Sequence, residues 1–532
     1  MSSAVSTAGG SNHALLRTLS RVLTQLATRS NAAKLIGAYF LYIVFKYRNT
    51  VYGYRLRPDL PGPPGLPLVG HLWGALTRPR DQVLQNFTEN HQKYGKVYSV
   101  TLPSVGRIIN ILDPEMLDHV LRVNFWAYEK GPRFKRVLQL LVGEGKCIFS
   151  ADGEHWKWQR KLASNIFNVK AFRHYTSNVF CQEAEIVIDY LNKIADTDKA
   201  VDLQQLFYCF TLDSFGEIAF GQSFGCLRDP DEPVEFAAAF DRLNHGLSGR
   251  FISVISPLKD WWTGNGERLR NDSKLVRGFA LDMIHERRRK QKEGQETSEG
   301  TGQKDLLQLF MDMKLDNGEV LSDDMLVDSV LNFVIAGRDT TAQALSWMFY
   351  LMHRSEADPN VWKRMVQETD ELLAGGHPTY ESTKQQKYAE SCFYEALRLY
   401  PSVPKNIKTC IEDDILPGGI RVYKGDRIGW CSWSMGRDTS IWGPDAKEYK
   451  PDRWLNSDKP SPAKFNAFHL GPRTCLGQHF ATIEAITIMS MLAQKFTFEL
   501  VDPKIEPAYM PSLTLPMAKG LPVRIKRRVD NA

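Results

Sequence analysis

A single cysteine stands in a short stretch rich in turn-forming residues, FHLGPRTCLG at 468–477. A thiolate that binds a metal needs an accessible sulfur on a rigid loop, backbone N–H groups that point at it, and positive charge nearby. Gly471 favours a turn, Gly477 lets the backbone come close, and Arg473 brings positive charge near Cys475. The helix-like apolar run that follows would place a helix N-terminus, which favours an anion, beside the sulfur. A lone cysteine in a turn is nevertheless more often structural, so the residues around Cys475 decide between a structural and a metal-binding role.

The spacing of those neighbours matches a specific pattern, Phe468-x-x-Gly471-x-Arg473-x-Cys475-x-Gly477. It resembles the haem-binding signature of the cytochromes P450. The resemblance implies that Cys475 is the axial thiolate ligand of the iron of haem b. It also implies that Phe468 shields the sulfur from water, that Arg473 reaches a haem propionate, and that Gly477 allows the backbone to approach.

A second segment, AGRDTT at 336–341, falls midway along a predicted long helix. Its counterpart in the family passes over the distal face of the haem. The resemblance implies that Gly337 leaves room for dioxygen, that Thr340 donates through its hydroxyl and orders water, and that Asp339 helps to relay protons. The structural alternatives are close helix packing for the glycine and a bond to the preceding turn for the threonine.

Two further segments supply side chains that suit a haem propionate. GEHWKWQRK places Trp156 and Arg160 four residues apart, on one side of a helix, where their N–H groups are suitable donors. In PSVPKNIK the family often has an arginine at the position of Lys408. A lysine can still pair with a carboxylate, although it lacks the bidentate fork of arginine.

A charged pair in YEALRLYPSVP, Glu395 and Arg398, is one helical turn apart. In the family this pair joins an arginine in a segment matched here by PDRW, which makes it Arg453. The three residues are then expected to form a buried charged network behind the haem. Its predicted role is structural rather than catalytic.

The elements that must position these residues are mostly helices. A helix capped by Ser322, with two aspartates in its first turn, is predicted to run to about Arg354. Another is predicted from just after Cys475 to about Lys495, and a C-terminal hairpin pairs 512–517 with 521–528. The predicted fold class is mainly α with small β-sheets (α+β), the P450 fold, with a long central helix over a buried haem.

The N-terminal region differs from the rest in charge. Residues 1–58 contain eight Lys or Arg and no Asp or Glu, and the uncharged run LIGAYFLYIVF occupies 35–45. Eleven residues of helix are too short to cross a bilayer core unaided. We therefore predict an amphipathic or membrane anchor over 1–57 that spans or lies on the membrane, a proline-rich hinge over 58–72, and a single haem domain over 73–532. An acid-free leader also resembles a mitochondrial transit peptide.

The composition excludes some classes of function. The net charge of +6, from 67 basic and 61 acidic residues, is too small to indicate nucleic-acid binding. The eight cysteines are scattered and form no CxxC motif, which indicates reduced thiols in a cytosol-facing protein.

The longer matching stretches resemble the fatty-acid and alkane ω-hydroxylases of plants and fungi. We therefore expect a monooxygenase that hydroxylates a long aliphatic chain, with a fatty acid at or near its ω end as the expected substrate. The reaction would use dioxygen and electrons from NADPH. NADPH-cytochrome P450 reductase would deliver the electrons, with cytochrome b5 as an additional candidate donor. The expected location is the endoplasmic reticulum membrane, with the catalytic domain in the cytosol and membrane lipid as a further partner; the alternative location is the mitochondrion.

Other functions stay open at this point. The substrate could be another hydrophobic molecule, such as an alkane, an aromatic compound, a terpenoid or a steroid. A haem-thiolate isomerase or dehydratase is a further alternative, although such enzymes tend to lack the threonine found here as Thr340. A haem carrier or gas sensor is the non-enzymatic alternative. The loop GEGKCIF departs from the resembled branch at Lys146 and Cys147. This loop helps to line the substrate pocket in the family, so the departure bears most directly on the length of the substrate chain and on the position that is hydroxylated.

Overall fold

The computed structural model describes residues 17–18, 20–22, 24, 29–143, 147–167, 170–232, 234–252, 256–293, 305–313, 318–456, 458–510 and 512–528. The chain forms two compact units. The smaller comprises residues up to 77 together with 99–107, and the larger comprises 78–98 together with 108 onwards. Strands β1 (Val97–Leu102) and β2 (Gly106–Ile111) carry the chain into and out of the smaller unit.

The smaller unit contains α2 (Arg29–Lys46) and α3 (Leu72–Thr77). Helix α2 covers the predicted apolar run, and its large apolar side chains, among them Ile36, Leu41 and Phe45, are exposed. Among the described residues, no helix is both long enough and apolar enough to cross a bilayer.

The larger unit is mainly helical. Its helices are α4 (Val83–Tyr94), α5 (Pro114–Asp118), α6 (Gly131–Val142), α7 (Gly153–Phe167), α8 (Lys170–Asn192), α9 (Leu203–Phe220), α10 (Glu235–Ile252), α11 (Ser256–Trp262), α12 (Asn265–Lys292), α13 (Leu306–Met311), α14 (Asp323–His353), α15 (Pro359–Leu373), α16 (Tyr380–Gln385), α17 (Lys387–Leu399), α18 (Ser432–Gly436), α19 (Thr439–Trp442) and α20 (Gln478–Lys495). With the small sheets described below, they confirm the predicted mainly α fold class.

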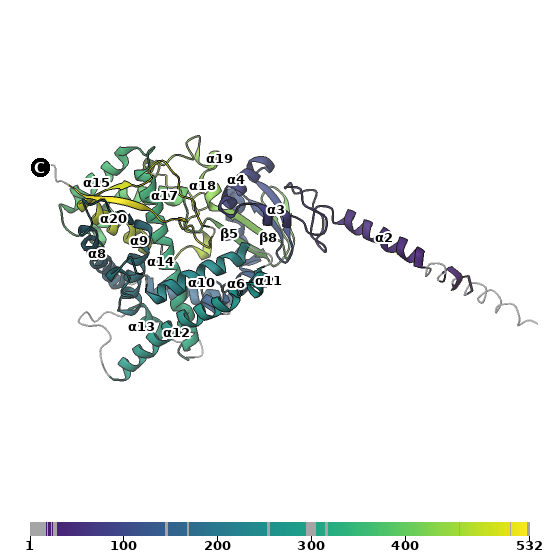
Figure 1. Cartoon of the computed structure of the whole chain (residues 1–532), viewed down its shortest axis with the longest axis horizontal. Coiled ribbons are helices and arrows are strands. Elements are labelled where there is room, and N and C mark those ends of the chain that lie inside the picture. Colours follow the sequence, from purple (N-terminus) through teal and green to yellow (C-terminus); the bar gives the residue numbers. More distant parts are fainter. Residues whose placement is uncertain are drawn as a thin grey trace, which may run out of the picture. The chain divides into compact units, whose positions relative to one another are not determined.

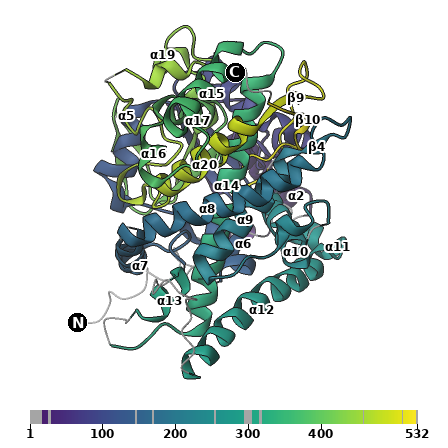
Figure 2. The same ribbon diagram turned by 90° about the vertical axis from the view of Figure 1, so that its left-hand side faces the viewer.

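Helix α14 runs through the middle of the larger unit. Figures 1 and 2 show it between α17 and α20 on one side and α10 and α12 on the other. As predicted, Ser322 caps it: the hydroxyl accepts a hydrogen bond from the Met325 N–H at 3.4 Å, and Asp323 and Asp324 lie in the first turn. The helix is buried on most sides, because apolar residues occupy nearly its whole circumference.

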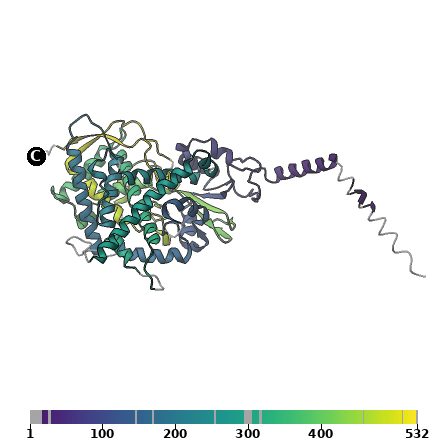
Figure 3. The same ribbon diagram turned by 60° about the horizontal axis from the view of Figure 1, so that its bottom comes forward.

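The strands form small sheets beside the helices. In the larger unit, β2 pairs in parallel with β8 (Arg427–Cys431), which pairs with β5 (Lys405–Cys410), which in turn pairs with β3 (Tyr128–Glu129). Strand β10 (Pro522–Arg527) lies between β4 (Val201–Asp202) and β9 (Phe496–Leu500), drawn in yellow at the edge of the helical body in Figure 3. A third sheet pairs β6 (Asp414–Leu416) with β7 (Ile420–Val422).

The predicted C-terminal hairpin is wrong in its first strand, because β10 pairs with β9 and not with 512–517. The backbone of 512–517 is held by side chains of three helices instead. Leu513 N–H donates to Ser248 of α10, Leu515 N–H to Gln343 of α14, and Met517 N–H to Gln204 of α9. The segment therefore covers the helical core without forming a strand.

The predicted charged network lies behind α14 and joins α17 to the segment at 450–454. Glu395 and Arg398 are completely buried and make two hydrogen bonds, at 2.7 and 2.8 Å. Arg398 also donates to the carbonyls of Ala446 and Glu448, which lie in irregular backbone. Arg453 donates to Glu395 at 3.4 Å. Buried charges persist only where they are paired and hydrogen-bonded, so this network braces irregular backbone against α17.

Replacing Arg398 with methionine should remove the strongest partner of a buried carboxylate. We expect Arg398→Met to lower the free energy of unfolding by about 3–5 kcal/mol, measured as a shift in the urea midpoint and in the yield of folded protein.

The matched control is Arg289→Met. Arg289 is an exposed residue of α12 that pairs with Glu286, so the same change should leave stability nearly unchanged there. An equal loss in the two variants would contradict the bracing role.

Candidate active site

A cavity of about 290 Å³ lies inside the larger unit, between α14 and the loop that carries Cys475. Most of the predicted site residues meet in it. Its lining includes Trp156, Arg160, Gly337, Thr340, Phe468, Arg473, Cys475 and Gly477. Lys408 and Asp339 are not among the lining residues, and Glu395, Arg398 and Arg453 belong to the network described above. The sequence motifs, far apart along the chain, therefore converge on one space.

The loop before Cys475 is fixed by a glycine that no other residue could replace without a shift. Gly471 has φ +69°, and a Cβ built there would collide with the carbonyl of Leu121. The Cys475 N–H donates to the Phe468 carbonyl at 2.9 Å, which closes the turn. Gly477 is the N-cap residue of α20, so the sulfur lies just before a helix N-terminus, as predicted.

Cys475 differs from the other cysteines in what its sulfur faces. All eight are free; six are buried, Cys181 is half-buried, and Cys475 is exposed to the cavity. Burial in the protein raises the pKa of the Cys475 thiol, while the Gly477 N–H and the charge of Arg160 act to lower it. The loop thus presents an uncovered sulfur to an internal space.

On the opposite wall, α14 contributes Gly337 and Thr340. A Cβ on Gly337 would come within 2.8 Å of the Phe215 ring, so close packing of α9 on α14 also requires the glycine. The Thr340 hydroxyl donates to the Ala336 carbonyl at 2.6 Å, one turn earlier. This bond within the helix is the structural alternative considered for the threonine, and the hydroxyl oxygen also offers acceptor lone pairs to the cavity.

Asp339 points away from the cavity and towards α10. Its carboxylate accepts from Arg338 at 3.0 Å and from Asn244 at 2.6 Å. Burial raises the pKa of Asp339 to about 6, although Arg338 opposes the rise. Arg338 also pairs with Asp241, whose side chain is half exposed. Asp339 is therefore linked through Arg338 to the surface of the protein.

The cavity has a strongly cationic end. Arg473 lies 4.5 Å above the Trp156 ring and donates to Asp152 at 3.0 Å. Burial lowers the pKa of Arg473 to about 10, and its Nε has no partner among the described residues. Arg160 also lines the cavity, and burial lowers the pKa of its guanidinium. The cationic side chains at this end therefore outnumber the carboxylates that pair with them.

Lys408 lies behind this end and not on its surface. It is 1% exposed, and its Nζ makes no hydrogen bond to a described residue. Burial, together with the charges of Arg473 and Lys130, lowers the pKa of Lys408 well below its ordinary value. Lys130, just before α6, lines the cavity directly, and the sequence analysis missed it.

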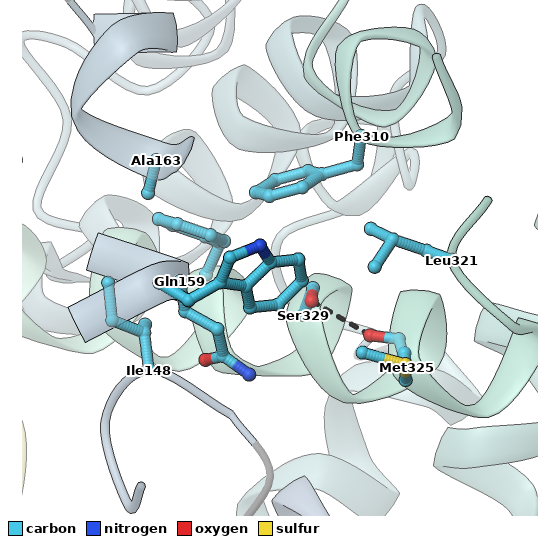
Figure 4. Close-up of a pocket in the computed structure, with 9 residues that line it drawn as sticks. Ile148, Gln159, Ala163, Phe310, Leu321, Met325 and Ser329 are labelled. Atoms are coloured by element: carbon cyan, nitrogen blue, oxygen red, sulfur yellow. Dashed lines mark hydrogen bonds between the residues drawn. The ribbon is translucent and has the colours of Figure 1, made fainter. Parts of the chain in front are cut away.

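A much smaller cavity, of about 20 Å³, adjoins the first and has room for about one water molecule. Figure 4 shows Gln159 and Ala163 of α7, Phe310 of α13, and Met325 and Ser329 of α14 around it. Trp158 of α7 packs here and does not line the main cavity. Ile148 and Phe333 line both cavities and form the wall between them.

The loop that departs from the resembled branch contributes to that wall. Ile148 and Phe149 line the main cavity, which supports a part in shaping it. Cys147 is buried, and its sulfur lies 3.1 Å from the Ser150 hydroxyl oxygen. Lys146 lies outside the described residues.

Several lining residues had no motif to reveal them. Asn332 of α14 is buried with its Oδ1 unpartnered among the described residues, and Asn406 and Phe215 also face the cavity. The one available signal was the polar residue inside the apolar run LNFVIAG. A polar residue such as Asn332 in a buried helix predicts a hydrogen-bonding partner, but it does not predict which group that partner is.

A family model described as Cytochrome P450 matches residues 60–521. The chain belongs to the cytochrome P450 family. It is 38% identical over 519 residues to cytochrome P450 monooxygenase cyp1 of Mycosarcoma maydis, covering 93% of this chain and 80% of that protein. It is 35% identical to cytochrome P450 86B1 of Arabidopsis thaliana, covering 78% of this chain and 76% of that protein. Its identity to cytochrome P450 94B3 of the same plant is 32%, over 93% and 97% of the two chains.

P450 enzymes are oxidoreductases that bind haem b through a cysteine thiolate, and this chain is a P450 monooxygenase. They take electrons from redox partners and bind hydrophobic substrates. The residues present fit the haem group. One end of the cavity offers the uncovered sulfur of Cys475, and the cations around Arg473 lack the anions that the carboxylates of a haem would supply.

The raised pKa of Asp339 gives a pH-dependent stability. A carboxyl whose pKa rises from 3.8 to about 6 on folding favours the folded state less and less as pH increases through that interval. Relative to Asp339→Asn, the P450 should therefore lose roughly 1.4 kcal/mol of unfolding free energy between about pH 5 and about pH 8. Urea unfolding of both proteins across this range is the measurement. Parallel pH profiles would show that Asp339 does not hold a proton near neutral pH.

Proposed function

We propose that this P450 hydroxylates a long aliphatic chain, a fatty acid at or near its ω end. The observation that carries the proposal is the cavity itself. It joins the Cys475 sulfur to Thr340 and is otherwise lined mainly by apolar side chains, among them Phe215, Ile335 and Leu397. The α14 residues that line it extend from 332 to 344, about 18 Å along the helix axis. The part of this space along α14 that a bound haem would leave free suits a narrow, extended hydrocarbon chain.

The proposed cofactor contacts follow from the same geometry. Cys475 would hold the haem iron through its thiolate, with Phe468 packed beside it against Tyr394 and Gly477 giving close backbone approach. Trp156, Arg160 and Arg473 hold the haem propionates, because they place N–H donors at the cationic end of the cavity. Lys408 lies behind this end without lining it, and a propionate nearby would favour its charged form, which burial otherwise disfavours by lowering its pKa.

Haem b, when bound, supplies the activation of dioxygen. The chain supplies the protons and the orientation. The Thr340 oxygen accepts a hydrogen bond from water in the cavity, because its own proton is held by Ala336. Asp339 helps to relay protons, with its carboxyl group positioned by Arg338 and Asn244, and its pKa of about 6 suits proton exchange near neutral pH. Apolar walls exclude other water and direct the end of the substrate chain towards the sulfur side.

The proposed partners are those that a membrane-associated P450 requires. Electrons come from NADPH-cytochrome P450 reductase, with cytochrome b5 as an additional donor. Residues 1–57 anchor the protein to lipid, supported by the exposed apolar side chains of α2 and by the absence of acidic residues in this region. The segment at 58–72 acts as a hinge and 73–532 as the haem domain. The proposed location is the endoplasmic reticulum membrane, with the mitochondrion as the alternative.

A substrate panel tests the function most directly. The full chain, supplied with reductase and NADPH, should convert fatty acids from dodecanoate to octadecanoate into products hydroxylated at or near the ω end, as determined by mass spectrometry.

The control is Cys475→Ser, which should form no product because the proposed thiolate ligand is lost. Products from steroids or aromatic compounds alone would overturn the proposed substrate class.

Thr340→Ala tests the arrangement of water in the cavity. Without the hydroxyl oxygen as acceptor, we expect product formed per NADPH to fall at least about tenfold, with hydrogen peroxide released in its place. Thr340→Ser keeps the oxygen and should stay close to the unaltered enzyme. Fully coupled turnover by Thr340→Ala would remove the proposed role.

A further inference from the structure

Asn332 is a polar side chain in a mainly apolar wall of the cavity. It belongs to α14, is 5% exposed and lines the same space as Thr340 and Cys475. Phe333 and Ile335, its near neighbours along the helix that also line the cavity, are apolar. An amide carries two N–H donors and a carbonyl acceptor, and these groups need hydrogen-bond partners when they are buried.

The described part of the protein provides no such partner for the amide oxygen. The Oδ1 atom of Asn332 is buried and accepts no hydrogen bond from a described residue. The polar side chains one turn earlier on α14 are engaged elsewhere. Asp328 pairs with Arg277 at 2.7 Å. The Ser329 hydroxyl donates to the Met325 carbonyl at 2.8 Å. Because an unpaired buried polar group costs free energy, this asparagine weakens the fold unless a ligand pairs with it.

Asn332 is well separated from the place of reaction. It lies about 12 Å from Thr340 along the axis of α14, with Ala336 of the cavity wall between them. A single carbon–carbon bond is about 1.5 Å long, so a zigzag hydrocarbon chain needs about eight to ten bonds to cover this distance. A long chain with its reacting end near Thr340 therefore places a carbon near its middle beside Asn332.

The chemistry of an amide favours a neutral partner over a charged one. A buried carboxylate needs a cation or several donors, whereas Asn332 stands among apolar side chains. A hydroxyl group both donates and accepts, so one such group can pair with the oxygen and the nitrogen of the amide. A saturated hydrocarbon chain can pair with neither.

We propose that Asn332 binds a hydroxyl group in the middle of the substrate chain. The inference rests on the proposed function and narrows it. The preferred substrate is a long fatty acid that already carries a hydroxyl group, about eight to ten carbons from the end that is oxidised. A site that hydrogen-bonds a hydroxyl group discriminates against an analogue that lacks it, because its own polar group is then left unpaired.

The experiment is an optical titration of the haem spin state in the haem-loaded full chain. The ligands are 10-hydroxyoctadecanoate, octadecanoate, and 2-hydroxyoctadecanoate, whose hydroxyl group lies next to the acid group. The variant Asn332→Leu keeps a side chain of similar size and removes its polarity. The control Asn360→Leu makes the same change at the exposed start of α15.

The unaltered protein should bind 10-hydroxyoctadecanoate at least about tenfold more tightly than the other two acids. Asn332→Leu should lose this preference, because it binds the 10-hydroxy acid more weakly and octadecanoate no less tightly. Without any fatty acid, Asn332→Leu should also unfold at a higher urea concentration, since an apolar group replaces an unpaired amide. Asn360→Leu should keep the preference.

Equal binding of the three acids by an unaltered protein that converts octadecanoate to its ω-hydroxy product would overturn this inference and leave the proposed function standing. The inference would also fail if Asn332→Leu kept the preference or unfolded at a lower urea concentration, because the amide would then have its partner within the protein. A protein that responds to none of the acids and converts none would overturn the proposed substrate class, and this inference with it.

Discussion

The structure is organised around keeping one sulfur uncovered inside the protein. Side chains normally close over any internal space, so an accessible thiol there requires walls that cannot collapse. On one side, Gly471 locks the loop of Cys475 against the Leu121 carbonyl. On the other, α14 is buried on most of its faces and cannot move inward without disturbing α9, α12 and α17. The Glu395–Arg398 pair holds the irregular backbone behind.

The positive charge in the cavity indicates that the ligand bound there carries negative charge. Arg473, Lys408 and Lys130 lie near Asp152, with Glu129 also acting on Arg473 and Lys408, and burial lowers the pKa values of all three cations. Such a cluster is unfavourable while it lacks anions and becomes favourable when carboxylates enter. An anionic ligand that binds at this end therefore also stabilises the fold. The reason is that part of the free-energy cost of burying these cations is offset only in the complex.

Local patterns were sufficient to predict the motifs but not their surroundings. The ends of α14 follow from capping and periodicity, whereas the Cys475 loop and the charged network were expected from the resemblance of short motifs to the family. Lys130 and Phe215 could not be identified, because their importance comes from which distant elements they face. The segment at 512–517 was misassigned for a related reason. Its strand-like sequence gave no sign that helix side chains would take its backbone hydrogen bonds.

The two cavities share Ile148 and Phe333 in their linings, so these two side chains separate them. A partition of that kind is held by rotamer preference, and an off-rotamer side chain costs only on the order of 0.5–1.5 kcal/mol. The space available to a bound substrate can therefore change at these two side chains at a small cost in free energy, whereas the backbone around it stays in place. Evolution could lengthen or shorten the permitted guest by exchanging either side chain, without rebuilding the backbone that presents the sulfur.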